Sequence, residues 1–296
     1  MDRDDIRAQN GVGLELLSRG FPDRARATFQ RALDQAEAQD PTSPASVATC
    51  LTNLATAHRE LGHAAQARAL LERALAIDET FHGTSHPHVA RDYEALGETL
   101  RDLGKHAQAR PMLECALVID EAVGGADHPV VAADLSSLAA LLCDLGHVLE
   151  AKPLLERALA IDEKTCGPDH PDVAAVVANL AQVTALGQPP AARPMLERAL
   201  AIAERTYGPD HPIVEERLAS LAMVFHDLGL AAEARPRIER ALAMAESLHG
   251  PAHPRVASAL SNLGLVLRAL GLPDEAERLL ERAFAIAVPS GTPGHD

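Results

Sequence analysis

The 296-residue sequence has few aromatic side chains and few basic ones. It contains five Phe, two Tyr and no Trp, too few to build the stacking platforms that hold single-stranded bases. Lys and Arg together number 27 against 42 Asp and Glu, giving a formal net charge of −15. Because nucleic acids and anionic membrane surfaces are bound by cationic surfaces, this composition argues against both as partners.

Long apolar runs and paired cysteines are also missing. No stretch approaches the ~20 apolar residues that span a bilayer, and the polar, acidic start at residues 1–5 lacks the apolar segment of a secretory signal. The four cysteines show no Cys-x-x-Cys spacing. These absences predict a cytoplasmic protein with reduced thiols. With 47% hydrophobic residues, the chain has enough apolar material to form a core.

Internal repetition is what the sequence has in abundance. The string Leu-Glu-Arg-Ala-Leu-Ala-Ile begins at Leu71, and variants of it recur at a spacing of about 42 residues, beginning at Phe29, Leu113, Leu155, Leu196, Ile238 and Leu280. His-Pro recurs in phase from His86 to His253, and Leu-Gly recurs from Leu61 to Leu270. This period predicts one solenoid over residues 1–288 and a flexible tail over 289–296. The predicted repeats are 4–42, 43–84, 85–126, 127–168, 169–209, 210–251 and 252–287.

Each repeat is expected to form two helices. Proline after histidine suits the first position of a helix, and the glycine of Leu-Gly ends that helix. A second proline, as at Pro111 or Pro194, falls near the start of the second helix, where the first-turn amides need no intrahelical partner. The fifth repeat has lost one residue before Gly187. We therefore expect the superhelix to change its curvature near residues 183–190.

The pattern resembles the tetratricopeptide repeat. Its Ala-x3-large half is present in every repeat, as in Ala67-x3-Leu71, and Leu-Gly-x2-Leu survives at Leu96 and Leu263. The 42-residue length exceeds the usual ~34 and is similar to the kinesin light chain type. The resemblance implies an all-α, right-handed superhelical solenoid of seven helix-turn-helix repeats, whose first helices line a concave groove.

Polar side chains that vary between repeats are predicted to face this groove. Residues that only pack would repeat, whereas a varied lining can select a ligand. The candidate groove residues are Asn53, Thr56, Arg59, Arg91, Glu94, Glu98, Arg101, Ser137, Asn179, Gln182, Ser220, His226, Asn262 and Arg268.

Asparagines recur at one slot of the groove, at Asn53, Asn179 and Asn262. In kinesin-light-chain-like relatives, asparagines in this slot hold the backbone of an extended peptide, and the resemblance implies the same role here. The alternative is that they only solvate an exposed helix face. Arg91 and Glu94, with the other charges of the third repeat, are interpreted either as an anchor for a charged ligand side chain or as a solvated face.

Catalytic and metal motifs are not recognisable. Five of the fourteen histidines belong to His-Pro and lie one repeat apart, too far to share an ion, so we interpret them as turn and cap residues. His-Glu-x-x-His, phosphate loops and Gly-x-Ser-x-Gly are absent. We predict no metal or other cofactor.

The favoured function is a non-catalytic scaffold that binds an extended, neutral or basic peptide or protein segment in the groove. The alternative is a small-molecule-binding protein or enzyme with its site inside the superhelix, which perturbed titratable groups in a closed pocket would favour. Weak self-association through the last repeat is also predicted, because apolar residues such as Leu280 and Phe284 have no helix after them to cover them.

Overall fold

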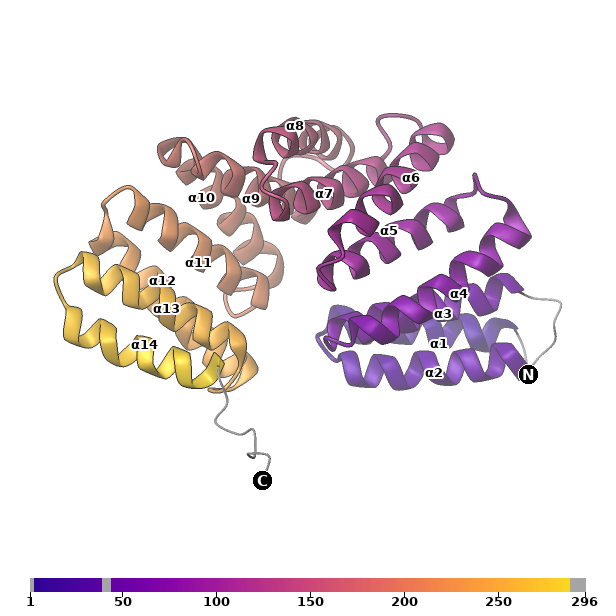
Figure 1. The fold of residues 1–296 in the computed structure, drawn as a ribbon, viewed down its shortest axis with the longest axis horizontal. Coiled ribbons are helices and arrows are strands. Elements are labelled where there is room, and N and C mark those ends of the chain that lie inside the picture. Colours follow the sequence, from indigo (N-terminus) through magenta and orange to yellow (C-terminus); the bar gives the residue numbers. More distant parts are fainter. Residues whose placement is uncertain (1–2, 39–43, 288–296) are drawn as a thin grey trace, which may run out of the picture. The chain divides into compact units, whose positions relative to one another are not determined.

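The computed structural model describes residues 3–38 and 44–287, and these form α-helices and no strands (Figure 1). The helices are α1 (Arg3–Ser18), α2 (Pro22–Ala38), α3 (Pro44–Glu60), α4 (Ala64–His82), α5 (Pro87–Asp102), α6 (His106–Gly124), α7 (Pro129–Asp144), α8 (Val148–Thr165), α9 (Pro171–Ala185), α10 (Pro189–Tyr207), α11 (Pro212–Asp227), α12 (Ala231–His249), α13 (Pro254–Ala269) and α14 (Pro273–Ala287). The predicted fold class, an all-α solenoid of seven helix pairs, is confirmed.

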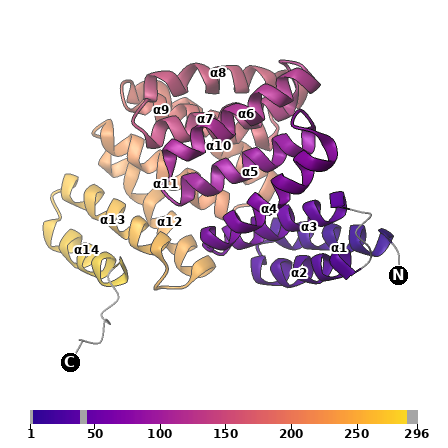
Figure 2. The same ribbon diagram turned by 45° about the vertical axis from the view of Figure 1, so that its right-hand side comes forward.

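The chain divides into two compact units, residues 1–154 and 155–296, and each is described by itself. Within each unit, successive helices pack in chain order, and alternate helices such as α3 and α5, or α11 and α13, also touch (Figure 2). A single domain over residues 1–288 stays a prediction. The predicted tail, residues 289–296, lies outside the described residues.

Histidine caps the first helix of five repeats. His128 has extended backbone angles, φ −75° and ψ 141°, and Pro129 follows as the first helical residue. The Nδ1 atom of His128 accepts a hydrogen bond from the amide of Val130 at 3.3 Å. The same bond, to the amide two residues on, recurs at His86, His170, His211 and His253. The interpretation of these histidines as cap residues is confirmed.

The Leu-Gly pair ends most first helices through a left-handed glycine. At the end of α5, Gly104 has φ 68°, its amide donates to Arg101 O at 2.8 Å, and the Lys105 amide donates to Leu100 O at 2.8 Å, which is a Schellman arrangement. In the shortened fifth repeat, Gly187 is not left-handed. Its amide still donates to the carbonyl three residues back, Thr184 O, but the next amide, of Gln188, donates to Thr184 O at 2.8 Å rather than to the carbonyl five residues back. The lost residue therefore changes the turn, while the expected change of curvature stays a prediction.

The second-helix prolines lie deeper than predicted. Pro111 is the sixth residue of α6, which begins at His106, and Pro194 holds the same place in α10. Only the first four amides of a helix lack an intrahelical acceptor, so the expectation of first-turn prolines is wrong. Each proline removes one backbone hydrogen bond within a helix that continues past it.

The repeated alanine and the large residue after it fill the space between paired helices. Ala109 is fully buried and Leu113 is 1% exposed, and they face Gly97 of α5. A Cβ atom on Gly97 would lie 2.6 Å from Leu113 Cδ2. This close approach explains why small residues occupy the slot of Gly97 in every repeat. It also fixes which side of each first helix turns away from its partner helix.

Candidate functional site

In residues 1–154, the predicted groove residues lie on one face and bond to each other across neighbouring repeats. The Asn53 amide donates to Asn10 Oδ1 at 3.0 Å, which links α3 to α1. The Asn10 amide in turn donates to Cys50 Sγ at 3.3 Å. Thr56 donates within its own helix, to the carbonyl of Thr52 at 3.0 Å. The amide side chain of Asn53 is therefore already engaged by the protein.

The charged residues of this face pair with polar residues of neighbouring repeats in two groups. The guanidinium of Arg59 pairs with Glu98 and lies 3.3 Å from Asp102, both on α5. Glu98 also accepts a hydrogen bond from the hydroxyl of Ser137 on α7 at 3.1 Å. Arg101 pairs with Asp144 at 3.1 Å. These side chains form ion pairs and hydrogen bonds with one another, and these interactions hold α3, α5 and α7 together.

Arg91 does not take part in these ion pairs. Its guanidinium reaches toward two fully buried carboxylates, Asp78 at 3.9 Å and Asp92 at 3.7 Å. Arg59, rather than Arg91 or Arg101, therefore supplies the positive charge next to Glu98. Glu94 has no such partner, and burial, with the charges of Glu98 and Asp120, raises its pKa to about 7.

Buried aspartates are the part of this unit that the sequence analysis missed. Asp134 of α7 is 0% exposed, and burial, with the charges of Glu94 and Asp120, raises its pKa to about 8. Asp92 accepts a hydrogen bond from Thr52 at 2.7 Å, yet burial raises its pKa to about 6. The signal was present in the repeat: Asp92 and Asp134 occupy the same slot of two successive first helices, directly before the core residues Tyr93 and Leu135 in the sequence.

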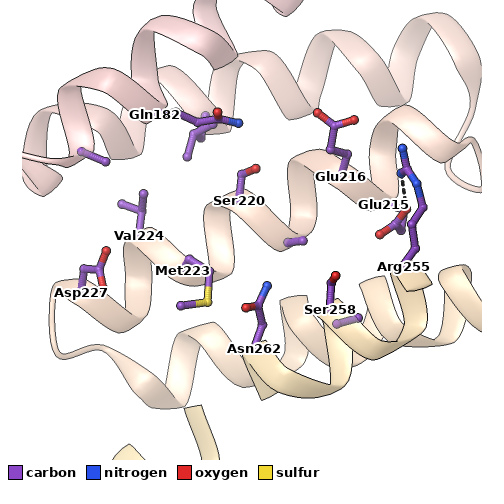
Figure 3. A pocket seen from close by; sticks show the side chains of 14 residues that line it. Gln182, Glu215, Glu216, Ser220, Met223, Val224, Asp227, Arg255, Ser258 and Asn262 are labelled. Carbon is purple, nitrogen blue, oxygen red and sulfur yellow. Dashed lines mark hydrogen bonds and ion pairs between the residues drawn. The ribbon is translucent and has the colours of Figure 1, made fainter. Parts of the chain in front are cut away.

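In residues 155–296, the corresponding face has an open hollow of about 420 Å³ (Figure 3). We call it the α11 pocket, because α11 forms its floor while α9 and α13 supply its sides. Its lining residues are Gln182, Ala185, Leu196, Glu215, Glu216, Ala219, Ser220, Met223, Val224, Asp227, Arg255, Ser258, Ala259 and Asn262. The volume is within the usual range for ligand sites, roughly 300–1,000 Å³.

Three predicted groove residues meet in this pocket, one from each of three successive first helices. Gln182 comes from α9, Ser220 from α11 and Asn262 from α13 (Figure 3). No side-chain hydrogen bond joins any of them to another described residue. Their donors and acceptors therefore point into open space, unlike the amide of Asn53.

The charges around the α11 pocket are mainly acidic. Glu215, Glu216 and Asp227 line it, against one cation, Arg255. Arg255 pairs with the buried Glu215 at 3.0 Å, so this pair holds α11 and α13 together at one side. Asp227 stands at the other side, half exposed (Figure 3). The lining as a whole favours a neutral or cationic ligand.

The other predicted residues of this unit lie outside the lining. Asn179 is half-buried on α9, one turn before Gln182. The Nδ1 atom of His226 lies 3.2 Å from Asp227 Oδ1, and Arg268 is exposed on α13. Glu215 and Arg255 are lining residues that the prediction missed, because their pairing depends on how two repeats stack.

A second hollow of about 640 Å³ lies between α13 and α14. It shares Ser258 and Asn262 with the α11 pocket and adds Phe284, whose side chain is 69% exposed. Leu280 is only partly buried there, whereas its counterparts in the preceding repeats, such as Ile238, are buried. The last helix pair therefore presents apolar surface, as predicted.

The comparisons with known proteins agree with this fold. The tetratricopeptide repeat family model matches residues 4–80, 51–122, 89–164, 131–205 and 215–287, so the chain belongs to the tetratricopeptide repeat family. None of the curated proteins matches it. No helix in the described ranges is both long and apolar enough to cross a membrane.

Solved structures extend the likeness. A kinesin light chain-type protein of Podosopora anserina with nearly identical TPR-like repeats is 27% identical, with a TM-score of 0.56 over 70% of this chain and 98% of that one. This confirms the resemblance to the kinesin light chain type. A Rap protein complexed with Competence and Sporulation Factor is 16% identical, with a TM-score of 0.72 over 96% of this chain and 74% of that one. The Rap conjugation gene regulator of plasmid pLS20, in complex with the Phr* peptide, matches with the same identity and TM-score, over 93% and 71%.

Proposed function

We propose that the chain is a non-catalytic interaction scaffold that binds an extended peptide segment across the α11 pocket. The observation that carries the proposal is the set of unengaged polar side chains of Gln182, Ser220 and Asn262 around one cavity. An amide offers a donor and an acceptor together, which is what the backbone of an extended peptide requires. The Rap regulator solved in complex with the Phr* peptide has a similar fold, and this likeness of fold supports the proposal.

The size of the pocket indicates the length of the bound segment. Helices that pack together lie roughly 8–10 Å apart, so α9, α11 and α13 together span about 20 Å. An extended chain rises ~3.3 Å per residue, which corresponds to a segment of about six residues. Met223 and Val224 on the pocket floor would accept an apolar side chain between the polar contacts.

The charge of the lining sets the composition of the segment. Asp227 and Glu216 are at least 46% exposed and flank the pocket, so a lysine or arginine near either end of the peptide would be favoured. An acidic peptide would be repelled, since the chain as a whole carries −15. Nucleic acid and membrane surfaces are not expected as partners, and a cytoplasmic location stays a prediction.

The test uses a peptide selected from a random twelve-residue display library against the full chain. We expect the selected peptides to be neutral or basic. Substituting Asn262→Ala or Gln182→Ala should weaken their binding about fivefold or more, since a lost hydrogen bond is worth ~1 kcal/mol. Asn179→Ala should also weaken binding, but by less, because Asn179 lies one turn before Gln182 and outside the lining. Fluorescence anisotropy of the labelled peptide measures the affinity.

Asn53→Ala is the matched control, because Asn53 occupies the same slot as Asn262 but donates to Asn10. Its peptide affinity should equal that of the unchanged chain. Selected peptides that bind the Gln182→Ala, Asn262→Ala double variant as tightly as the parent would contradict the proposed site.

We also propose weak self-association through the last helix pair, where Phe284 is exposed. Light-scattering mass should rise with protein concentration for the parent and stay monomeric for Phe284→Asp. A strictly monomeric mass for both, at high concentration, would count against this proposal.

A further inference from the structure

Three histidine side chains meet where α4 turns into α5. His82 is the last residue of α4, His86 caps α5, and His88 is the second residue of that helix. The ring centroids are 4.0 Å apart for His82 and His86, and 5.0 Å apart for the other two pairs. One ring nitrogen of each histidine lies within 4.8 Å of the other two. This turn therefore gathers three imidazoles in residues 1–154.

A buried carboxylate stands behind two of these rings. Asp78, one helical turn before His82, is 0% exposed. Its Oδ1 lies 3.9 Å from His82 Nε2, and its Oδ2 lies 3.8 Å from His88 Nδ1. All four atoms are buried and none has a hydrogen-bond partner among the described residues. Since buried polar atoms are normally satisfied, this set indicates a site that takes a ligand.

Arg91 is the charged side chain next to His88 and Asp78. Burial, together with this arginine, lowers the pKa of His88 below its ordinary value of 6.5. Arg91 also lies 3.9 Å from Asp78 and balances its charge.

We propose that His82, His86 and His88 bind one divalent transition-metal ion of the Zn²⁺ class, with Asp78 behind them. Imidazole nitrogen is a preferred ligand of zinc, which usually takes four ligands. A ligating histidine typically donates its other N–H to a carboxylate. Asp78 is placed to accept from His82 Nε2 and His88 Nδ1, which leaves the opposite nitrogen of each ring for the ion.

Small side-chain rotations would complete the site. Zinc–nitrogen bonds are ~2.0–2.1 Å long, so two nitrogens on one ion lie about 3.3 Å apart. The rings must therefore move inward by an ångström or so, and His82 and His86, now stacked at 9°, must tilt. His86 would exchange the amide of His88, at 3.2 Å from its Nδ1, for the ion. The bound ion would join the end of α4 to the start of α5.

Later repeats supply the internal control. His249 and His253 stack with centroids 4.6 Å apart, as His82 and His86 do. However, Arg255 occupies the place that corresponds to His88. The stacking therefore belongs to the repeat, whereas the third imidazole and the buried Asp78 are found together only at α4 and α5 among the described repeats.

The probe is Zn²⁺ itself, added to the full chain after chelator treatment and dialysis. Cys166, His170 and Asp172 form a second, mostly exposed group of metal-binding side chains, so the parent for these measurements carries Cys166→Ser. Calorimetry should give one Zn²⁺ per chain, and Zn²⁺ should raise the thermal midpoint, because a ligand of the native state stabilises it. Co²⁺ should give the visible absorption of a four-coordinate ion.

Single substitutions distinguish Zn²⁺ binding at this site from Zn²⁺ binding by other surface histidines. His88→Gln and His82→Gln should each weaken Zn²⁺ binding at least tenfold and remove the thermal shift, while His249→Gln should change neither. His86→Asn retains a side chain that can cap α5, and it should still weaken Zn²⁺ binding. If His82→Gln fails to fold, His88→Gln still decides, since that side chain is 41% exposed. Equal Zn²⁺ affinity and thermal shift in His88→Gln and its parent would overturn the proposal.

Discussion

The two units of the chain use the same helix face in different ways. In residues 1–154 the polar side chains of the first helices bond to one another, as Asn53 does to Asn10 and Glu98 to Ser137. In residues 155–296, Glu215 and Arg255 pair in a similar way at one side of the α11 pocket, but Gln182, Ser220 and Asn262 make no side-chain hydrogen bond to another described residue. A repeat slot alone therefore does not define a binding residue. What matters is whether the neighbouring repeat supplies a partner for it.

The largest expected difference between the units is in their response to pH. The pKa of Asp134 is raised to about 8 and that of Glu94 to about 7, so the native state holds protons that the unfolded chain releases above pH 4. The free energy of unfolding should therefore fall as pH rises from about 4 to about 8. Asp134 alone would lower the free energy of unfolding by roughly 4 kcal/mol between pH 5 and pH 8.

Chemical denaturation at pH 5 and at pH 8 measures this loss in the free energy of unfolding. Asp134→Asn, which cannot ionise, should be more stable than the parent at pH 8 and should show a flatter profile. Hydrogen exchange should locate the loss mainly in residues 1–154. A loss of equal size in both units, or a profile unchanged by Asp134→Asn, would contradict the assignment.

The next-largest effect on stability is expected at the slot that Gly97 and Gly264 share, where the first helix of a repeat packs closely against the second. Gly97→Ala places a methyl group 2.6 Å from Leu113 Cδ2, whereas Gly264→Ala places one 3.0 Å from Leu280. Overpacking typically costs about 1–3 kcal/mol, and we expect Gly97→Ala to fall within that range and Gly264→Ala below it, because Leu280 is only partly buried. Thermal unfolding of the two variants measures the difference, and the reverse order would be inconsistent with the packing described.

A smaller effect is expected at the arginine slot. Arg59 pairs with Glu98 and Asp102 while 27% exposed, so Arg59→Ala should cost about 1–2 kcal/mol by leaving two half-buried carboxylates without their cation. Arg268 holds the same slot in the last repeat but is exposed. Arg268→Ala should therefore stay within about 0.5 kcal/mol of the parent. Urea denaturation gives both values, and equal costs would mean that the pairing of Arg59 contributes nothing.

The smallest effect on stability separates the two asparagines. Asn53→Ala removes the hydrogen bond to Asn10, which is partly buried, and should cost about 1 kcal/mol. Asn262→Ala removes no bond between described residues and should cost less than about 0.5 kcal/mol. Peptide affinity should fall more for Asn262→Ala than for Asn53→Ala. A stability loss at Asn262 larger than at Asn53 would mean that Asn262 has a structural role.

The repeat and its helices could be predicted because their signals are local. His-Pro fixes the start of a first helix and Leu-Gly its end, so seven helix pairs follow from spacing alone. The depth of Pro111 could not be predicted, because His106 begins α6 without a side-chain cap bond that a sequence pattern would mark. A helix boundary that is set by backbone geometry alone, without a capping side chain, cannot be located from a sequence pattern.

The candidate site was predictable only in part, because its contacts join residues about 40 positions apart. The face that carries Gln182, Ser220 and Asn262 follows from register. Whether such a residue finds a partner depends on the side chains of the next repeat, as the pairing of Glu215 with Arg255 shows. The approach of His88 to His82 and Asp78 likewise arises from the turn between α4 and α5. It could not be predicted from the histidines of His-Pro alone.

A crystal structure of the full chain with a selected peptide would show whether the α11 pocket is the binding site. We expect an extended peptide of about six ordered residues whose backbone bonds to the side chains of Gln182, Ser220 and Asn262, with a basic residue near Asp227 or Glu216. A peptide seated on α3 and α5, or on the second helices, would contradict it.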